Sequence, residues 1–168
     1  MTTIDKAKYK NTILFLCDKL GGKIEGKKKL YKLLYYVDFD RYQYNESMKS
    51  VTGEVYKKLP MGPVPDHGKD LLVEMSNDGI LDISTEEQYP GFLPTTVYSS
   101  SVKPDMDVFD KDDIAILHMV AAKYGHLNGK QLEDLTHNEA PYIASDDMCE
   151  IPYELTFYRN TDFDICLV

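Results

Sequence analysis

One stretch limits the possible folds of this chain more than any other, KKKLYKLLYYVDFDRYQYN at residues 27–45. It holds five tyrosines and one phenylalanine and no glycine or proline, so it predicts a helix that opens at Lys27. At about 100° per residue, one side collects apolar residues: Leu30, Leu33, Leu34, Val37 and Tyr44. A second side, about a quarter turn away, collects tyrosines around one carboxylate: Tyr31, Tyr35, Tyr42 and Asp38.

A helix with two apolar sides either lies deep in the fold or presents one side to a partner. In the first case the rings fill the core and their hydroxyls reach polar rims. In the second, the tyrosines form a patch that contacts another protein, because tyrosine is enriched in binding hot spots. Both interpretations stay open at this point.

The length of 168 residues favours one domain, residues 1–168. No window approaches the apolar length of a membrane span, and the N-terminus has no signal-peptide pattern, so we expect a soluble, cytoplasmic protein without membrane contact. Three separated cysteines, Cys17, Cys149 and Cys166, form no paired motif and are expected to be reduced thiols.

Charge is distributed unevenly along the chain. The net charge is −9, yet residues 1–60 hold 13 Lys and Arg against 7 Asp and Glu, whereas residues 61–168 hold 6 against 21. This asymmetry indicates a charged partner, or else a solvated acidic surface that aids solubility. An acidic surface repels nucleic acid and attracts a basic protein.

The rest of the chain predicts a helix-rich α+β domain with a small antiparallel hairpin. Helices are expected over Ile4–Leu20, over Lys69–Asn77 with Asp66 as N-cap, after Asp110, and over Gly129–Leu135. The expected inner stripe of the helix after Asp110 is Ile114, Leu117, His118, Ala121 and Tyr124. Thr136 or Asn138 is expected to cap a further short turn.

Strands are expected over Val51–Leu59, Ile80–Ile83 and Thr95–Tyr98, and Pro60–Pro65 is expected to form a rigid, extended corner. Residues 23–26 are interpreted as a connection, and the last residues as another helix or an edge segment. A helix followed by a hairpin is also an arrangement found in winged-helix domains.

The sequence contains no recognisable catalytic or metal centre. Four scattered histidines lack the spacing of a zinc site, and the aspartates at 105–113 lack the glycine and glutamate of a calcium loop. Phosphate-binding glycine motifs are missing as well. A thiol protease built from His137, Glu139 and Cys149 would need a specific sequence context, and that context is missing. We therefore expect no enzyme, no metal and no cofactor.

Three segments together resemble the Panacea (SocA-like) antitoxin domain. They are KLYKLLYYVD at 29–38, Thr52-Gly53 with the LPMGPVP stretch at 59–65, and LTHNEAPY at 135–142 with Ile151-Pro152-Tyr153. Tyr142 stands where tryptophan is common in that family, and Thr136 and Asn138 also depart from its usual residues.

The resemblance implies a non-enzymatic antitoxin that binds and silences a cognate toxin, often a translation inhibitor. We predict toxin contact by Tyr31, Tyr35, Asp38 and Tyr42. The remaining motif residues are expected to be structural or contact residues: Leu30, Lys32, Leu33, Leu34, Pro60, Gly62, Pro63, Val64, Pro65, His137 and Glu139. Of these, His137 and Glu139 are expected to form a capping, hydrogen-bonded pair.

Two other functions remain open. A DNA-binding transcriptional regulator would use a basic patch, and the lysines at 23, 27, 28, 29 and 32 provide one. An adaptor that delivers a partner protein to a protease would share the binding role. The sequence does not fix the toxin or the oligomeric state.

Overall fold

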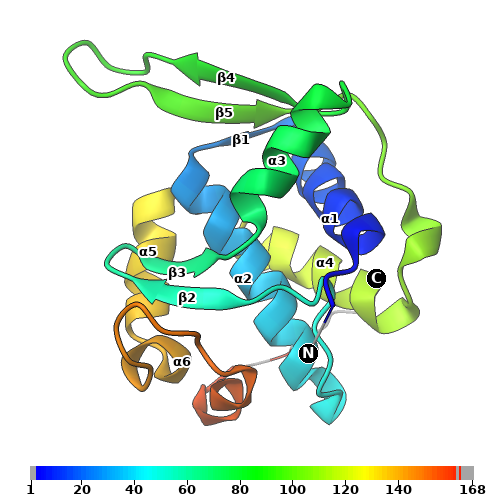
Figure 1. The fold of residues 1–168 in the computed structure, drawn as a ribbon, viewed down its shortest axis with the longest axis vertical. Coiled ribbons are helices and arrows are strands. Elements are labelled where there is room, and N and C mark those ends of the chain that lie inside the picture. The colour runs from blue at the N-terminus through cyan, green and yellow to red at the C-terminus, as the bar shows by residue number, and fades with distance from the viewer. Residues whose placement is uncertain (1–2, 162, 164–168) are drawn as a thin grey trace.

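The tyrosine-rich helix, α2 (Lys27–Gln43), runs through the middle of the molecule (Figure 1). The computed structural model describes residues 3–161 and 163. The main elements packed against α2 are α4 (Lys111–Tyr124), α5 (Gly129–His137), strand β3 (Gly62–Pro65) of the two-stranded β2–β3 ribbon, and the 3-10 turn η3 (Tyr153–Tyr158). Helix α1 (Lys6–Lys19) packs against α4. Residues 30–41 of α2 are all buried, so other elements cover both of its apolar sides.

The described part of the chain is mainly helical, as the sequence predicts, with small antiparallel sheets. The helices are α1 (Lys6–Lys19), α2 (Lys27–Gln43), α3 (Gly68–Asn77), α4 (Lys111–Tyr124), α5 (Gly129–His137) and α6 (Ala140–Ile143). Three short 3-10 turns are η1 (Tyr44–Glu46), η2 (Met106–Val108) and η3 (Tyr153–Tyr158). The strands are β1 (Lys23–Glu25), β2 (Tyr56–Leu59), β3 (Gly62–Pro65), β4 (Asp82–Glu86) and β5 (Thr95–Ser99).

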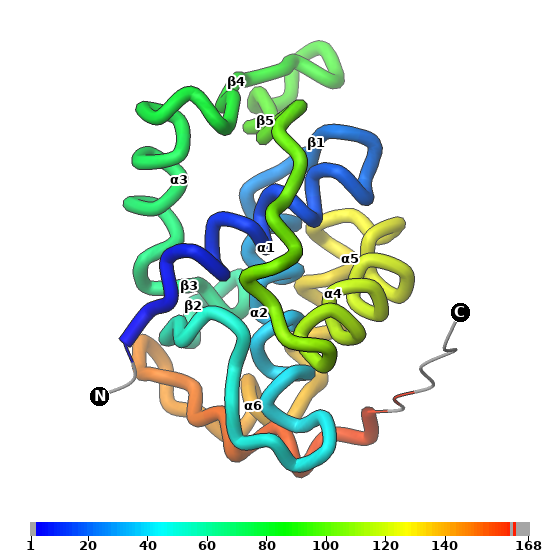
Figure 2. The backbone as a smooth tube through the Cα atoms, turned by 90° about the vertical axis from the view of Figure 1, so that its right-hand side faces the viewer, coloured from blue at the N-terminus to red at the C-terminus, as the bar shows by residue number. Residues whose placement is uncertain are grey.

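A three-stranded sheet in the order β1-β5-β4 lies at one end of the molecule, and α6 lies toward the other (Figures 1 and 2). Ile24 faces Tyr98 across the β1–β5 pair, and Ile83 faces Tyr98 across the β4–β5 pair. The β4–β5 hairpin follows α3, as expected. The third strand of this sheet is β1, where the sequence predicts only a connection. Three residues are too few to show an alternating pattern.

The expected corner over Pro60–Pro65 is a turn only at Pro60 and Met61; from Gly62 to Pro65 the chain is strand β3, so the interpretation as a corner is wrong for those four residues. Pro63 and Pro65 stand opposite Lys58 and Tyr56 in the β2–β3 ribbon. The backbone groups of Lys58 and Tyr56 bond instead to residues 148–151 on the other edge of β2. The prolines therefore occupy positions where β3 needs no N–H donor toward β2, which is where a strand tolerates them.

Two helix ends differ from the expectations, and two agree. The N-cap of α3 is His67, not Asp66, and the N-cap of α6 is Glu139, not Thr136 or Asn138. Asp66 instead pairs with Lys57 at 3.0 Å. Asp110 caps α4 as predicted, in a reciprocal capping box with Asp113, and α4 ends at Gly125.

The inner side of α4 is rotated from the predicted stripe. Its buried residues are Asp113, Ile116, Leu117, Val120 and Tyr124, and His118 is exposed, edge-on to the Phe15 ring. The sequence pattern did not predict this rotation, because an aspartate such as Asp113 is expected on the surface of a helix. In the fold it accepts hydrogen bonds from Lys8 at 2.7 Å and Arg41 at 2.8 Å, and its carboxylate is therefore paired inside the protein.

Candidate functional site

Asp38 joins the central helix to the Thr52-Gly53 segment. Its carboxylate accepts hydrogen bonds from the backbone N–H groups of Val51 (3.0 Å) and Thr52 (2.8 Å). The hydroxyls of Thr52 (2.6 Å) and Tyr56 (2.7 Å) complete the set. Burial raises the pKa of Asp38 to about 6, although these hydrogen bonds oppose the rise. Asp38 is thus a buried structural anchor in this fold.

Glu54 is a second anchor, and the sequence analysis missed it. It accepts from the Tyr9 hydroxyl at 2.8 Å and from the His67 backbone N–H at 3.0 Å, and it lies 2.8 Å from His67 Nδ1. Glu54 therefore links α1, β2 and the start of α3. The available signal was the single acid of the predicted strand Val51–Leu59, which a buried carboxylate with several donors would explain.

The β2–β3 ribbon is held against α2 by Lys32. The buried ammonium donates to the Pro63 carbonyl at 2.9 Å, and burial lowers the Lys32 pKa to about 8. Gly62 lets the ribbon come this close, because a Cβ there would stand 2.5 Å from Lys32 Cε and 3.0 Å from Thr136 Oγ1. The first two family-like segments and the α5 end of the third therefore meet at one packed contact.

The residues of these segments divide into core and surface. Leu30, Leu33 and Leu34 are fully buried; Gly62, Pro63 and Pro65 are buried; Val64 is half-buried; and Pro60 is exposed. His137 and Glu139 are half-buried.

His137 and Glu139 do not form the expected pair. The His137 ring stacks on Tyr142, with centroids 4.4 Å apart, and Tyr142 in turn donates to the Leu59 carbonyl at 2.7 Å. Glu139 turns inward, where it accepts from the Tyr35 hydroxyl at 3.4 Å and lies 3.6 Å from Arg159 Nη1. The expectation failed because Arg159, which attracts Glu139, is remote in sequence.

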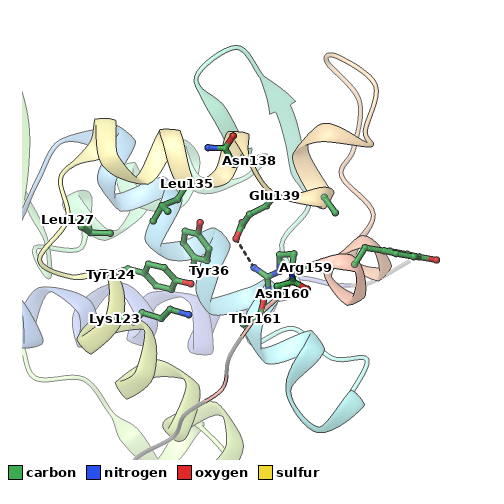
Figure 3. Close-up of a pocket in the computed structure, with 12 residues that line it drawn as sticks. Tyr36, Lys123, Tyr124, Leu127, Leu135, Asn138, Glu139, Arg159, Asn160 and Thr161 are labelled. Atoms are coloured by element: carbon green, nitrogen blue, oxygen red, sulfur yellow. Dashed lines mark ion pairs between the residues drawn. The ribbon is translucent and has the colours of Figure 1, made fainter.

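A pocket of about 470 Å³ opens beside this carboxylate (Figure 3). Tyr36 and Tyr124 stack at 3.9 Å on one wall, and Arg159 and Glu139 stand at the other end. Arg159 is also bound to buried Asp40 at 2.7 Å. Burial raises the Glu139 pKa to about 7 against the pull of the Arg159 guanidinium.

The chemistry of this pocket is limited. Its described lining residues include no cysteine, serine or histidine. Lys123 and Thr161 also line it, but neither is hydrogen-bonded to the Glu139 carboxylate among the described residues, so no nucleophile–base pair is formed. Cys149 lies elsewhere, exposed on the segment that pairs with β2, and Cys17 is buried. Cys166 lies outside the described residues. We assign no reaction to the pocket.

The four residues predicted to contact a toxin are placed very differently. Tyr31 and Tyr35 are buried, with exposed fractions of 4% and 0%, and Asp38 is fully buried. Tyr42 is half-buried at the rim, where its ring stacks on Tyr153 and its hydroxyl donates to Glu154 at 3.2 Å. In this fold the first three have almost no area to give a partner. Toxin contact by these residues stays a prediction, and Tyr42 alone among them keeps solvent-accessible area.

The five lysines of the expected basic patch lie in β1 and in the first turns of α2, and they are largely engaged within the protein. Lys23 pairs with Glu25, Lys28 pairs with Glu133 at 2.6 Å, and Lys29 donates to the Gly125 carbonyl. Lys32 is buried, and Lys27 lies over the Tyr31 ring. A nucleic-acid surface needs cations that are free to meet phosphates. This arrangement therefore disfavours the patch as a DNA-reading surface.

Residues 3–161 and 163 contain no cluster of three or more His, Cys, Asp or Glu side chains that could hold a metal ion. No helix in the same part of the chain is long and apolar enough to span a membrane.

Comparison with protein families finds a match over most of the described core of the chain. The family model described as "Antitoxin SocA-like, Panacea domain" matches residues 30–142. Searches of curated proteins and of solved structures found no match. The matched region runs from the start of the buried part of α2 to Tyr142 in α6, so it includes the packed contact between α2, the β2–β3 ribbon and α5.

Proposed function

The chain belongs to the SocA-like antitoxin family that carries the Panacea domain, and we propose that it neutralises a toxin encoded beside it by binding that toxin directly. The family match over residues 30–142 is the observation that carries the proposal. We further propose that the toxin blocks translation and that both proteins act in the cytoplasm. The role is one of binding, without catalysis and without a cofactor.

The charge of the chain supports a basic protein as the partner. The net charge is −9, and several lysines of the basic first half are engaged by acids of the second half. The excess that remains is acidic. A toxin that handles tRNA or nucleotides needs a basic surface, and an acidic protein can cover such a surface in place of phosphates.

Co-expression with the neighbouring gene tests this proposal. The adjacent open reading frame is placed under an inducible promoter, alone and together with this chain, and colony formation and incorporation of labelled methionine are measured. We expect killing and arrested translation by the neighbour alone, and full growth when both are present. A frame-shifted copy of this gene is the control, because it keeps the RNA and removes the protein.

Purified proteins then separate direct blocking from delivery to a protease. Direct blocking predicts that about one antitoxin per toxin inhibits the toxin and restores protein synthesis in a reconstituted translation reaction that contains no protease. Rescue that appears only in cells containing a protease would favour the alternative function, an adaptor that delivers the toxin to that protease. A harmless neighbour, or a toxic one that this chain does not restrain, would refute the antitoxin role.

A further inference from the structure

The β4–β5 hairpin, residues 82–99, extends away from the body of the molecule; we call it the hairpin arm (Figure 1). Every residue from Asp82 to Pro94 is exposed. The arm meets the core at its base, where Val97 and Tyr98 are buried beside β1. Farther out, its one hydrogen bond to the body among the described residues joins the exposed Gln88 amide to the exposed Glu25 carboxylate at 2.9 Å. Its outer half therefore adds little to the stability of the fold.

The tip of the arm is apolar and aromatic. Leu93 is 92% exposed, Phe92 74% and Tyr89 66%. These are large apolar side chains close together on a projecting loop, which is unusual for a surface with no partner. Large side chains at such a place are the kind that anchor an interface by filling a pocket on the partner.

The tip is also held in one shape. The Phe92 N–H donates to the Tyr89 carbonyl at 3.2 Å across Pro90 and Gly91, and Gly91 has φ +86°. Proline followed by a glycine of positive φ is the pattern of a type II turn. The Tyr89 and Phe92 rings lie edge to face, with centroids 6.2 Å apart. A preformed loop loses little conformational entropy when it binds.

The charge of the arm indicates which partner fits. It contains Asp82, Glu86 and Glu87 and no lysine or arginine. Two arms of identical chains packed together would place these like charges against one another, which disfavours an arm-to-arm dimer. A different protein with a basic rim would gain from the same charges.

We propose that the hairpin arm inserts its tip, Tyr89, Phe92 and Leu93, into an apolar cleft of the toxin whose rim carries lysine or arginine. This inference rests on the proposed function and names the surface that performs it. The rim cations meet Glu86 and Glu87, and the cleft takes the rings and the leucine. The arm is convex, so the matching surface on the toxin is concave.

The test compares two surface variants of the full chain against the purified product of the neighbouring toxic gene. The arm variant carries Phe92→Ser and Leu93→Ser. The matched control is Val73→Ser, which changes an apolar side chain that is 49% exposed on α3. Isothermal titration calorimetry gives Kd, thermal melting checks the fold, and co-expression reports neutralisation.

We expect the arm variant to bind about 100-fold or more weakly, because truncated hot-spot residues cost this much in other interfaces. Its melting temperature should stay within about 2 °C of the wild type, since the tip makes no core contact. The control should match the wild type in both measurements. Glu86→Gln with Glu87→Gln should weaken binding mainly through slower association.

Three results would overturn the inference. The arm variant could bind within about threefold of the wild type, its loss of binding could be matched by the Val73→Ser control, or light scattering could detect a wild-type dimer that the arm variant abolishes. In each case wild-type neutralisation would still stand. Failure of the wild-type chain itself to neutralise would instead refute the antitoxin role and this inference together.

Discussion

At the scale of residues, the tyrosines of α2 differ in burial and in what their hydroxyls meet. Buried Tyr35 reaches Glu139 and half-buried Tyr42 reaches Glu154, whereas Tyr36 stacks flat on Tyr124 and its buried hydroxyl has no hydrogen-bond partner among the described residues. Phe39, one turn beyond Tyr35, stacks on Tyr153 of η3. Aromatic residues suit this helix because each ring fills much volume while a hydroxyl can still reach a polar group at the edge of the core.

Alanine at Tyr35 and at Tyr42 separates a core ring from a rim ring. We expect Tyr35→Ala to lower the free energy of unfolding by about 3–5 kcal/mol, because it leaves a cavity among Tyr36, Phe39 and Tyr56. Tyr42→Ala should cost about 1 kcal/mol, since that side chain is only half-buried. Urea unfolding followed by circular dichroism measures both. A Tyr35→Ala protein that is as stable as wild type but fails to neutralise the toxin would support the prediction that Tyr35 contacts the toxin.

At the scale of elements, the β2–β3 ribbon depends on one close approach. Gly62 has φ +106°, and a Cβ there would meet Lys32 and Thr136. Gly91, in the tip of the hairpin arm, also has a positive φ of +86°, but nothing lies within 4 Å of its added Cβ. The two glycines therefore share the backbone requirement and differ in the crowding.

Gly91→Ala is accordingly the matched control for Gly62→Ala. Gly62→Ala should lose about 1–2 kcal/mol because an L residue is strained at positive φ. Gly91→Ala meets the same strain but should lose less, since the exposed tip of the arm can relax without disturbing the core. Gly62→Ala should lose about 1–3 kcal/mol in addition to its strain, since Lys32 must move and its hydrogen bond to Pro63 is disturbed. Guanidinium unfolding curves give both values. Equal losses would mean that the ribbon and α2 are less tightly packed than their distances indicate.

Local signals predicted the helices better than the strands. Gly21-Gly22 and Asp110 mark the end of α1 and the start of α4, because turn and capping chemistry acts over a few residues. The strand β1 has only three residues and exists because β5 pairs with it, so its own sequence carries no signal. The strand β3 carries prolines that argue against a strand unless its partner is known.

For the candidate site, where α2, the β2–β3 ribbon and α5 meet, the sequence predicted which segments take part but not which side chains touch. The motif stretches around α2, the ribbon and α5 were located from sequence, and the structure packs them together. What covers the second side of α2 was not predictable, because Tyr153, Thr156 and Arg159 come from more than 100 residues later. The direction of Glu139 follows from the same remote Arg159.

At the scale of the whole molecule, much of the opposite charge of the two halves is used inside the fold. Lys8 pairs with Asp113, Lys10 with Glu74, Lys28 with Glu133, and Arg41 with Asp110 and Asp113. The asymmetry along the sequence therefore reports on internal pairing as well as on a partner. The net excess of acid remains, and exposed acids on the hairpin arm contribute to it.

That excess predicts how association with the toxin responds to salt. Raising the ionic strength from about 50 mM to about 500 mM shortens the Debye length from roughly 14 Å to roughly 4 Å and screens long-range attraction between an acidic surface and a basic one. We expect the association rate constant to fall about 10-fold or more, while the dissociation rate constant changes by less than about twofold, because steering acts on encounter and buried apolar contacts act on release. Stopped-flow mixing of the purified pair measures the first constant, and competition with unlabelled antitoxin measures the second. The variant with Glu86→Gln and Glu87→Gln should show a shallower salt dependence than wild type, whereas Lys130→Ala, which removes the cation of an exposed pair with Asp134, should not. An association rate that is indifferent to salt would mean that the acidic surface serves solubility and that the toxin is recognised by shape alone.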